Sequence, residues 1–75
     1  MTPKTMIQTM TVRINGELKT LPGGVTLKEV AELYQLKEQS IAFELNRKVI
    51  ERQRYASVQL KENDTVEIVR FVGGG

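Results

Sequence analysis

The 75-residue sequence contains neither cysteine nor histidine. The absence of cysteine excludes disulfides, thiolate metal sites and a cysteine nucleophile. The absence of histidine removes the commonest general base and the commonest metal ligand. We therefore expect no metal site and no catalytic residue of its own, so that any chemistry at this protein needs catalysis from a partner.

The sequence also lacks a strong excess of basic over acidic residues, and it has no long apolar run. Its 11 basic residues are dispersed among 9 acidic ones, and a net charge of +2 is too small to indicate a nucleic-acid partner. No apolar run approaches the roughly 20 residues that span a bilayer, and the N-terminus has no signal-peptide core. We expect a cytoplasmic protein with one modest core and neither a nucleic-acid nor a membrane partner.

The first 22 residues predict an extension followed by a β-hairpin. Residues 1–9 show no period and are interpreted as an N-terminal extension, either flexible or not native, which could also lengthen the first strand. From Met10 to Ile14, apolar and polar residues alternate as in a half-buried strand. Asn15-Gly16 then predicts a type I′ turn, because both residues tolerate a positive φ.

The middle of the chain predicts one helix. Thr26 and Glu29 have the spacing of a capping box, which marks a helix N-terminus. An apolar stripe at helical spacing follows, and we expect the helix to end near Leu36. Tyr34 lies on that stripe, so core packing is its predicted role. Gly23-Gly24, just before the helix, lacks the spacing of a phosphate loop and is interpreted as a turn.

The second half predicts three further strands, at residues 41–45, 48–50 and 65–72, with Asn46-Arg47 as a turn between the first two. Residues 52–60 are irregular. The predicted order is ββαβββ, a single α+β domain over residues 10–72 in which a mixed sheet of four to five strands packs on one main helix.

The last three residues, Gly73, Gly74 and Gly75, are the most unusual feature of the sequence. Consecutive glycines favour a flexible tail, and a tail without side chains can thread a narrow channel in a partner. The carboxylate of Gly75 is ionised at neutral pH, because terminal carboxyl groups have a reference pKa of roughly 3.3–3.7. It could attack the α-phosphate of ATP if a partner positions the nucleotide and a metal. The alternative is an inert linker or cloning scar.

The last predicted strand has two different faces. We expect Val66 and Ile68 to point inward, which places Val69 and Phe71 on the opposite face, next to Val72. An exposed apolar patch here would be a docking site for an activating partner. The alternative is that the N-terminal extension or a loop covers these side chains, and the sequence leaves both interpretations open.

Four segments together resemble the β-grasp (ubiquitin-like) fold, and within it the ThiS family of sulfur carriers. The last segment is the most specific, because it joins an acidic turn, a β-rich strand and a glycine tail at the end of the chain. The segments are TVRINGE (residues 11–17), TLKEV (26–30), IAFELN (41–46) and NDTVEIVRFVGGG (63–75).

The resemblance implies a carrier for thiamine biosynthesis that is neither an enzyme nor the holder of a bound cofactor. A ThiF-like adenylyltransferase would adenylate Gly75 with ATP and Mg. Sulfur from a cysteine desulfurase would convert Gly75 to a thiocarboxylate, and a ThiG-like thiazole synthase would accept that sulfur. Three alternatives stay open: the small subunit of molybdopterin synthase, a ubiquitin-like modifier of lysines, and a β-grasp interaction domain with an inert tail.

Overall fold

The structure of the protein, a computed structural model, describes residues 8–71. Within that range the elements follow one another in the predicted order ββαβββ. The strands are β1 (Thr9–Ile14), β2 (Glu17–Pro22), β3 (Ile41–Leu45), β4 (Lys48–Ile50) and β5 (Thr65–Arg70), and the helix is α1 (Leu27–Leu33). Two short 3-10 helices, η1 (Glu38–Ser40) and η2 (Arg52–Arg54), complete the described elements.

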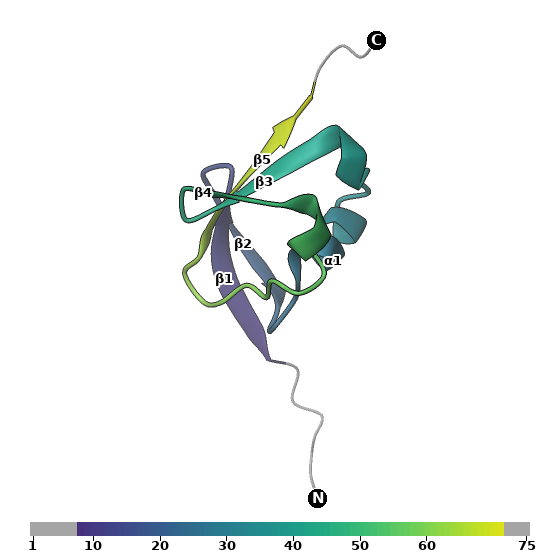
Figure 1. The fold of residues 1–75 in the computed structure, drawn as a ribbon. Helices are drawn as coiled ribbons and strands as arrows, with labels where there is room; N and C mark the ends of the chain where they lie inside the picture. The colour runs from purple at the N-terminus through teal and green to yellow at the C-terminus, as the bar shows by residue number, and fades with distance from the viewer. Residues whose placement is uncertain (1–7, 72–75) are drawn as a thin grey trace, which may run out of the picture.

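The five strands form one mixed sheet in the order β2-β1-β5-β3-β4. β5 runs parallel to β1 and antiparallel to β3, while both hairpins are antiparallel. The last strand in the sequence therefore lies at the centre of the sheet. Figure 1 shows α1 on one side of this sheet, and the C-terminal end of β5 opposite the start of β1.

Apolar residues from alternate strand positions and from one stripe of α1 form the core. Met10, Val12 and Ile14 are buried on the face of β1 that looks toward the helix, as their alternation predicts. Ile41, Phe43 and Val66 are buried on the same side of the sheet. Leu27, Val30 and Ala31 of α1 cover them, which confirms most of the predicted helix stripe.

The irregular stretch between β4 and β5 contributes two core residues that the sequence pattern did not identify. Tyr55 and Leu60 are both buried. The ring of Tyr55 meets that of Phe43 edge-on, with ring centroids 4.9 Å apart and an interplanar angle of 80°. The Tyr55 hydroxyl also accepts a hydrogen bond from the Phe43 backbone N–H at 3.3 Å.

Both predicted hairpin turns form with left-handed backbone at their two central residues. Asn15 and Gly16 have φ values of +50° and +86°, and Asn46 and Arg47 have values of +52° and +74°. These values are typical of type I′ turns, whose twist matches that of the strands they join.

The helix begins as predicted and ends earlier than predicted. The Glu29 N–H donates to the Thr26 hydroxyl oxygen at 3.1 Å and the Thr26 N–H donates to the Glu29 carboxylate at 2.8 Å, which completes the capping box. The expected end near Leu36 is wrong, because Gln35 takes a φ of +57° directly after the C-cap residue Tyr34.

A Schellman motif explains this early end. The Leu36 N–H donates to the Ala31 carbonyl at 2.8 Å, and the Gln35 N–H donates to the Glu32 carbonyl at 3.1 Å. The reversal turns Leu36 back onto the core. It leaves Tyr34 37% exposed, so the prediction that this ring belongs to the core is wrong.

The start of the domain also differs from its predicted boundary. Thr9 is the first residue of β1 and pairs with Pro22, so the first strand is one residue longer at this end, as the sequence allowed. The Gln8 carbonyl continues the ladder by accepting a hydrogen bond from the Gly23 N–H at 2.9 Å. Residues 1–7, the rest of the predicted extension, lie outside the described residues.

Candidate functional site at the end of the last strand

The glycine tail, which is predicted to carry the reactive group, follows β5 in the sequence after Phe71 and Val72. Gly73, Gly74 and Gly75, together with Val72, lie outside the described residues, so their roles stay predictions. The described part of the chain ends at Phe71, one residue after β5. The candidate site is therefore the C-terminal half of β5 and the surface around it.

The two sides of β5 are held differently near this end. On one side, pairing with β3 continues to Arg70, and the Phe71 N–H donates to the Ser40 carbonyl at 3.0 Å. On the other side, parallel pairing with β1 covers only Thr65 and Val66. Beyond Val66 the backbone of β1 has ended, and the side chain of Asn15 takes its place.

Asn15 bonds both polar backbone groups of one β5 residue. Its Oδ1 accepts a hydrogen bond from the Ile68 N–H at 2.7 Å, and its Nδ2 donates to the Ile68 carbonyl at 3.5 Å. The Asn15 backbone N–H also donates to the Val66 carbonyl at 2.9 Å. A turn residue thereby extends the β1 ladder by two residues toward the tail.

The predicted docking residues are exposed on the face of the sheet that α1 does not cover. Val69 is 44% exposed and Phe71 is 58% exposed. Val69 pairs with the half-buried Ala42, and Val49 of β4 is also exposed on this face. The inward positions of Val66 and Ile68 are confirmed, because Val66 is buried and Ile68 packs partly against the core. Docking itself stays a prediction.

The same face carries a pair of carboxylates that the sequence pattern did not reveal. Glu44 of β3 and Glu67 of β5 stand directly opposite each other in the antiparallel register. Like charges at directly opposite positions are destabilising. The pair gives the open face an acidic centre next to the apolar patch, and it forms only when β3 and β5 pair.

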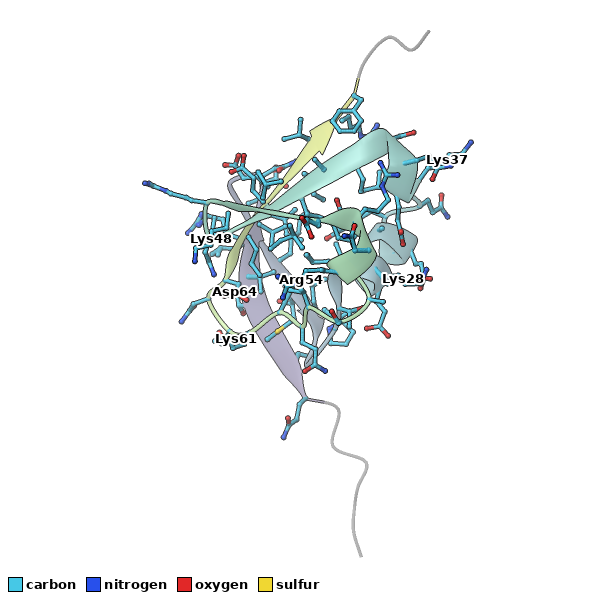
Figure 2. The ribbon with its side chains drawn as sticks, in the orientation of Figure 1. Lys28, Lys37, Lys48, Arg54, Lys61 and Asp64 are labelled. Atoms are coloured by element: carbon cyan, nitrogen blue, oxygen red, sulfur yellow. The ribbon has the colours of Figure 1, made fainter. Side chains whose placement is uncertain are left out.

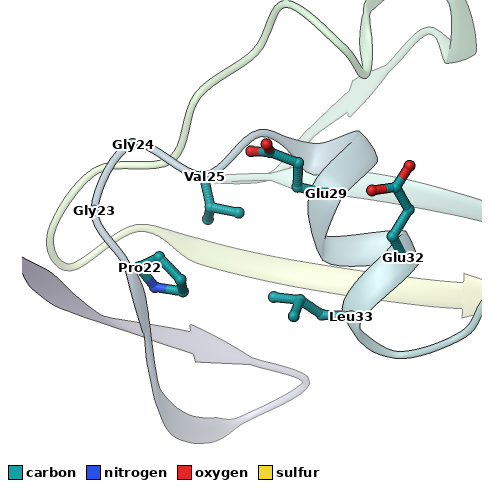
Figure 3. Close-up of a pocket in the computed structure, with 7 residues that line it drawn as sticks. All are labelled: Pro22, Gly23, Gly24, Val25, Glu29, Glu32 and Leu33. Carbon is teal, nitrogen blue, oxygen red and sulfur yellow. The ribbon is translucent and has the colours of Figure 1, made fainter. Parts of the chain in front are cut away.

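The loop between β2 and α1 borders a hollow of about 510 Å³ (Figure 3), which lies apart from the end of β5. Its Gly23-Gly24 segment is a turn, as predicted, with Gly24 at a φ of +78°. The Gly23 N–H is used by Gln8, and the Glu29 carboxylate is used in the helix cap. These groups serve the fold, so the hollow is a weak candidate for a functional site.

The basic side chains of the described residues that are labelled in Figure 2 are dispersed over the molecule. Figure 2 shows the labelled Lys28, Lys37, Lys48, Arg54 and Lys61 spread over different elements. Residues 8–71 contain no group of three or more acidic, histidine or cysteine side chains placed to hold a metal ion. Within the same residues, no helix is long and apolar enough to span a membrane.

A central final strand, a mixed sheet on one helix and an exposed strand end define a ubiquitin-like β-grasp domain. The crystal structure of the thiamine biosynthesis protein ThiS from Geobacter metallireducens is similar, with a TM-score of 0.76 and 29% sequence identity. The match covers 88% of this chain and 100% of that one. A sequence model of the ThiS family matches residues 12–75, and the chain belongs to the ThiS family.

Individual relatives fall into two groups. The sulfur carrier protein ThiS of Bacillus subtilis (strain 168) is 35% identical over 65 residues, which are 85% of this chain and 98% of that protein. Thiazole synthases of Magnetococcus marinus and Paramagnetospirillum magneticum are 35% and 30% identical over 66 residues. The chain spans 20% of the length of each of these synthases.

Proposed function

We propose that this protein is a sulfur carrier for thiazole formation in thiamine biosynthesis and that the carboxylate of Gly75 carries the sulfur. The observation that supports this most is the similarity to a sulfur carrier over 98% of that carrier's length. The family match extends to residue 75, so the glycine tail belongs to the matched region. No thiol or imidazole on the chain competes with the carboxylate, since the sequence has no cysteine and no histidine.

The proposed chemistry needs only the terminal carboxylate from this chain. A carboxylate oxygen of Gly75 attacks the α-phosphorus of ATP, pyrophosphate leaves, and an acyl adenylate forms. The terminal sulfur of a persulfide, formed from cysteine by a desulfurase, then attacks the carbonyl carbon and AMP leaves. A thiol reductant cleaves the S–S bond of the resulting acyl disulfide and is itself oxidised to a disulfide, which frees the thiocarboxylate. A ThiF-like adenylyltransferase would bind the ATP and Mg and stabilise the developing charge.

The open face of the sheet is the proposed docking surface for the activating enzyme. Val69 and Phe71 are exposed apolar side chains on the strand that leads into the tail, and Val72 follows them. Docking through these residues would bring the tail to the enzyme's active site in the same event. The acidic pair Glu44 and Glu67 would complement a basic surface on that enzyme.

A ThiG-like thiazole synthase is the proposed acceptor of the sulfur. Two proteins named thiazole synthase contain a segment that is similar to almost the whole of this chain. A carrier-like segment and a thiazole synthase thus occur in one polypeptide in those relatives, which supports an encounter between the two here.

The experiment incubates the protein with a ThiF-like enzyme, ATP, Mg, cysteine, a desulfurase and a thiol reductant, then measures its intact mass. We expect a gain equal to the replacement of one oxygen by sulfur, and no gain for a variant that lacks Gly75. The variant should keep the parent's melting temperature, which shows that the loss is chemical. No mass gain in the parent would reject the proposal, and high-mass conjugates would favour a protein modifier.

The acceptor is tested separately with the sulfur-loaded protein. Purified thiazole synthase, supplied with the substrates that accept the sulfur, should consume the thiocarboxylate and return the original mass. The large subunit of molybdopterin synthase, supplied with its own substrate, should not. The reverse preference would favour the molybdopterin alternative.

A further inference from the structure

In both hairpins, the side chain of the turn asparagine forms a hydrogen bond with the backbone of β5. Asn15 of the β1–β2 turn bonds the backbone of Ile68, and Asn46 of the β3–β4 turn accepts a hydrogen bond from the Thr65 N–H at 2.9 Å. A type I′ turn accepts glycine at this position as readily as asparagine. The turn geometry therefore does not explain the side-chain bonds.

The two asparagines act at different places along β5. Asn46 holds the first residue of the strand and is itself braced by the buried Asp64, whose Oδ1 accepts from its Nδ2 at 3.0 Å. Asn15 holds Ile68, two residues beyond the last β1 partner of the strand. Asn46 thus anchors the start of β5, and Asn15 acts nearest to the tail.

Without the Asn15 side chain, no hydrogen bond among those of the described residues would hold β5 on the β1 side after Val66. The backbone N–H and carbonyl groups of successive strand residues point to opposite sides. Those of Val69 and Phe71 point toward β3, so those of Arg70 point toward the β1 side. The end of β5 would then have hydrogen bonds to β3 alone, besides the partial packing of Ile68 on the core, and it could swing about that single line of hydrogen bonds.

We propose that Asn15 is a positioning residue for the reaction at Gly75, because it fixes the direction in which β5 delivers the tail. The inference rests on the proposed function of Gly75 and adds a residue 60 positions earlier in the sequence. A carboxylate must reach the α-phosphorus of ATP within a narrow range of distance and angle. A swinging strand end lowers the fraction of docked carriers that meet this condition.

The test compares Asn15→Gly with Asn46→Gly, because glycine keeps the positive φ of both turns and removes only the side chain. Thiocarboxylate formation is measured against carrier concentration to separate kcat from KM. We expect Asn15→Gly to lower kcat about fivefold to tenfold with KM within about twofold, because docking through Val69 survives. Asn46→Gly should lower the melting temperature and leave kcat within about twofold.

A second readout does not depend on the enzyme. Amide hydrogen exchange at Ile68 should accelerate about fivefold or more in Asn15→Gly, which is the effect of losing one or two hydrogen bonds. Asn15→Asp keeps an oxygen acceptor for the Ile68 N–H, so its exchange and its kcat should fall between those of the parent and the glycine variant.

Three results would overturn the proposal: unchanged Ile68 exchange in Asn15→Gly, a kcat equal to that of the parent, or an equal loss of kcat in Asn46→Gly. If the parent itself gains no sulfur, the proposed function fails, while the exchange measurement still decides whether Asn15 holds the strand. If the parent is active and Asn15→Gly matches it, the positioning role alone fails.

Discussion

The two ends of β5 are built in contrasting ways. At its start, Val66 is fully buried and the strand has a neighbour on each side. Asp64, labelled in Figure 2, is buried just before the strand and accepts a hydrogen bond from the Lys61 N–H at 2.7 Å. At its other end, one neighbouring strand and one asparagine hold the chain, and Val69 and Phe71 are exposed.

The contrast shows how one six-residue strand combines stability with access. The proposed reaction of Gly75 inside a partner requires a tail that leaves the sheet at an exposed point and that has a rigid origin. Burial of the first half of β5 supplies the rigid origin. Val69 and Phe71 offer apolar surface for the proposed docking at little cost in stability, because their exposed side chains contribute little to the core.

The largest expected effect on stability comes from Val66→Ala. Val66 is fully buried, so the loss of its methyl groups and the cavity they leave should lower the free energy of unfolding by about 2–3 kcal/mol. Urea unfolding measures this loss. The matched control is Val69→Ala on the same strand, which should change stability by no more than about 0.5 kcal/mol. Equal losses at both positions would contradict the comparison.

Phe71→Ser should act on the partner rather than on the fold. The ring is 58% exposed, so stability should change by about 0.5 kcal/mol or less, while KM for the carrier in the adenylation reaction rises about tenfold. Pyrophosphate release measures this change. Leu33→Ser is the control, because Leu33 is 52% exposed on α1, away from the open face of the sheet. A similar KM for both variants would place docking elsewhere.

Glu67→Gln should have the smallest effect of the three, and it should raise stability where the other substitutions lower it. Removing one of two like charges at directly opposite positions should raise the free energy of unfolding by about 0.5 kcal/mol. If the acidic pair meets a basic partner surface, KM for the carrier should rise as stability rises, and the change should shrink in high salt. Increased stability with unchanged KM would leave the pair without a role in docking.

Much of the fold was predictable because its signals are local. The alternation in β1, the two turns with asparagine at positive φ and the Thr26–Glu29 capping box each depend on neighbours within a few residues. The helix end was missed because the Schellman reversal occurs at Gln35, a residue without the usual preference of glycine for left-handed backbone. Tyr55 was missed because it lies in a stretch whose apolar residues follow neither strand nor helix periodicity.

By itself, the sequence determined the order of the elements, the inward faces of the strands and the glycine tail in which the chain ends. Only the tertiary structure decided that β5 lies between β1 and β3, that Glu44 meets Glu67, and that Asn15 bonds Ile68 across 53 positions. The physical reason is that backbone propensity and side-chain alternation act over a few residues, whereas strand pairing joins distant segments. The glycine tail was therefore recognisable from the sequence, and the way β5 leads into it required the fold.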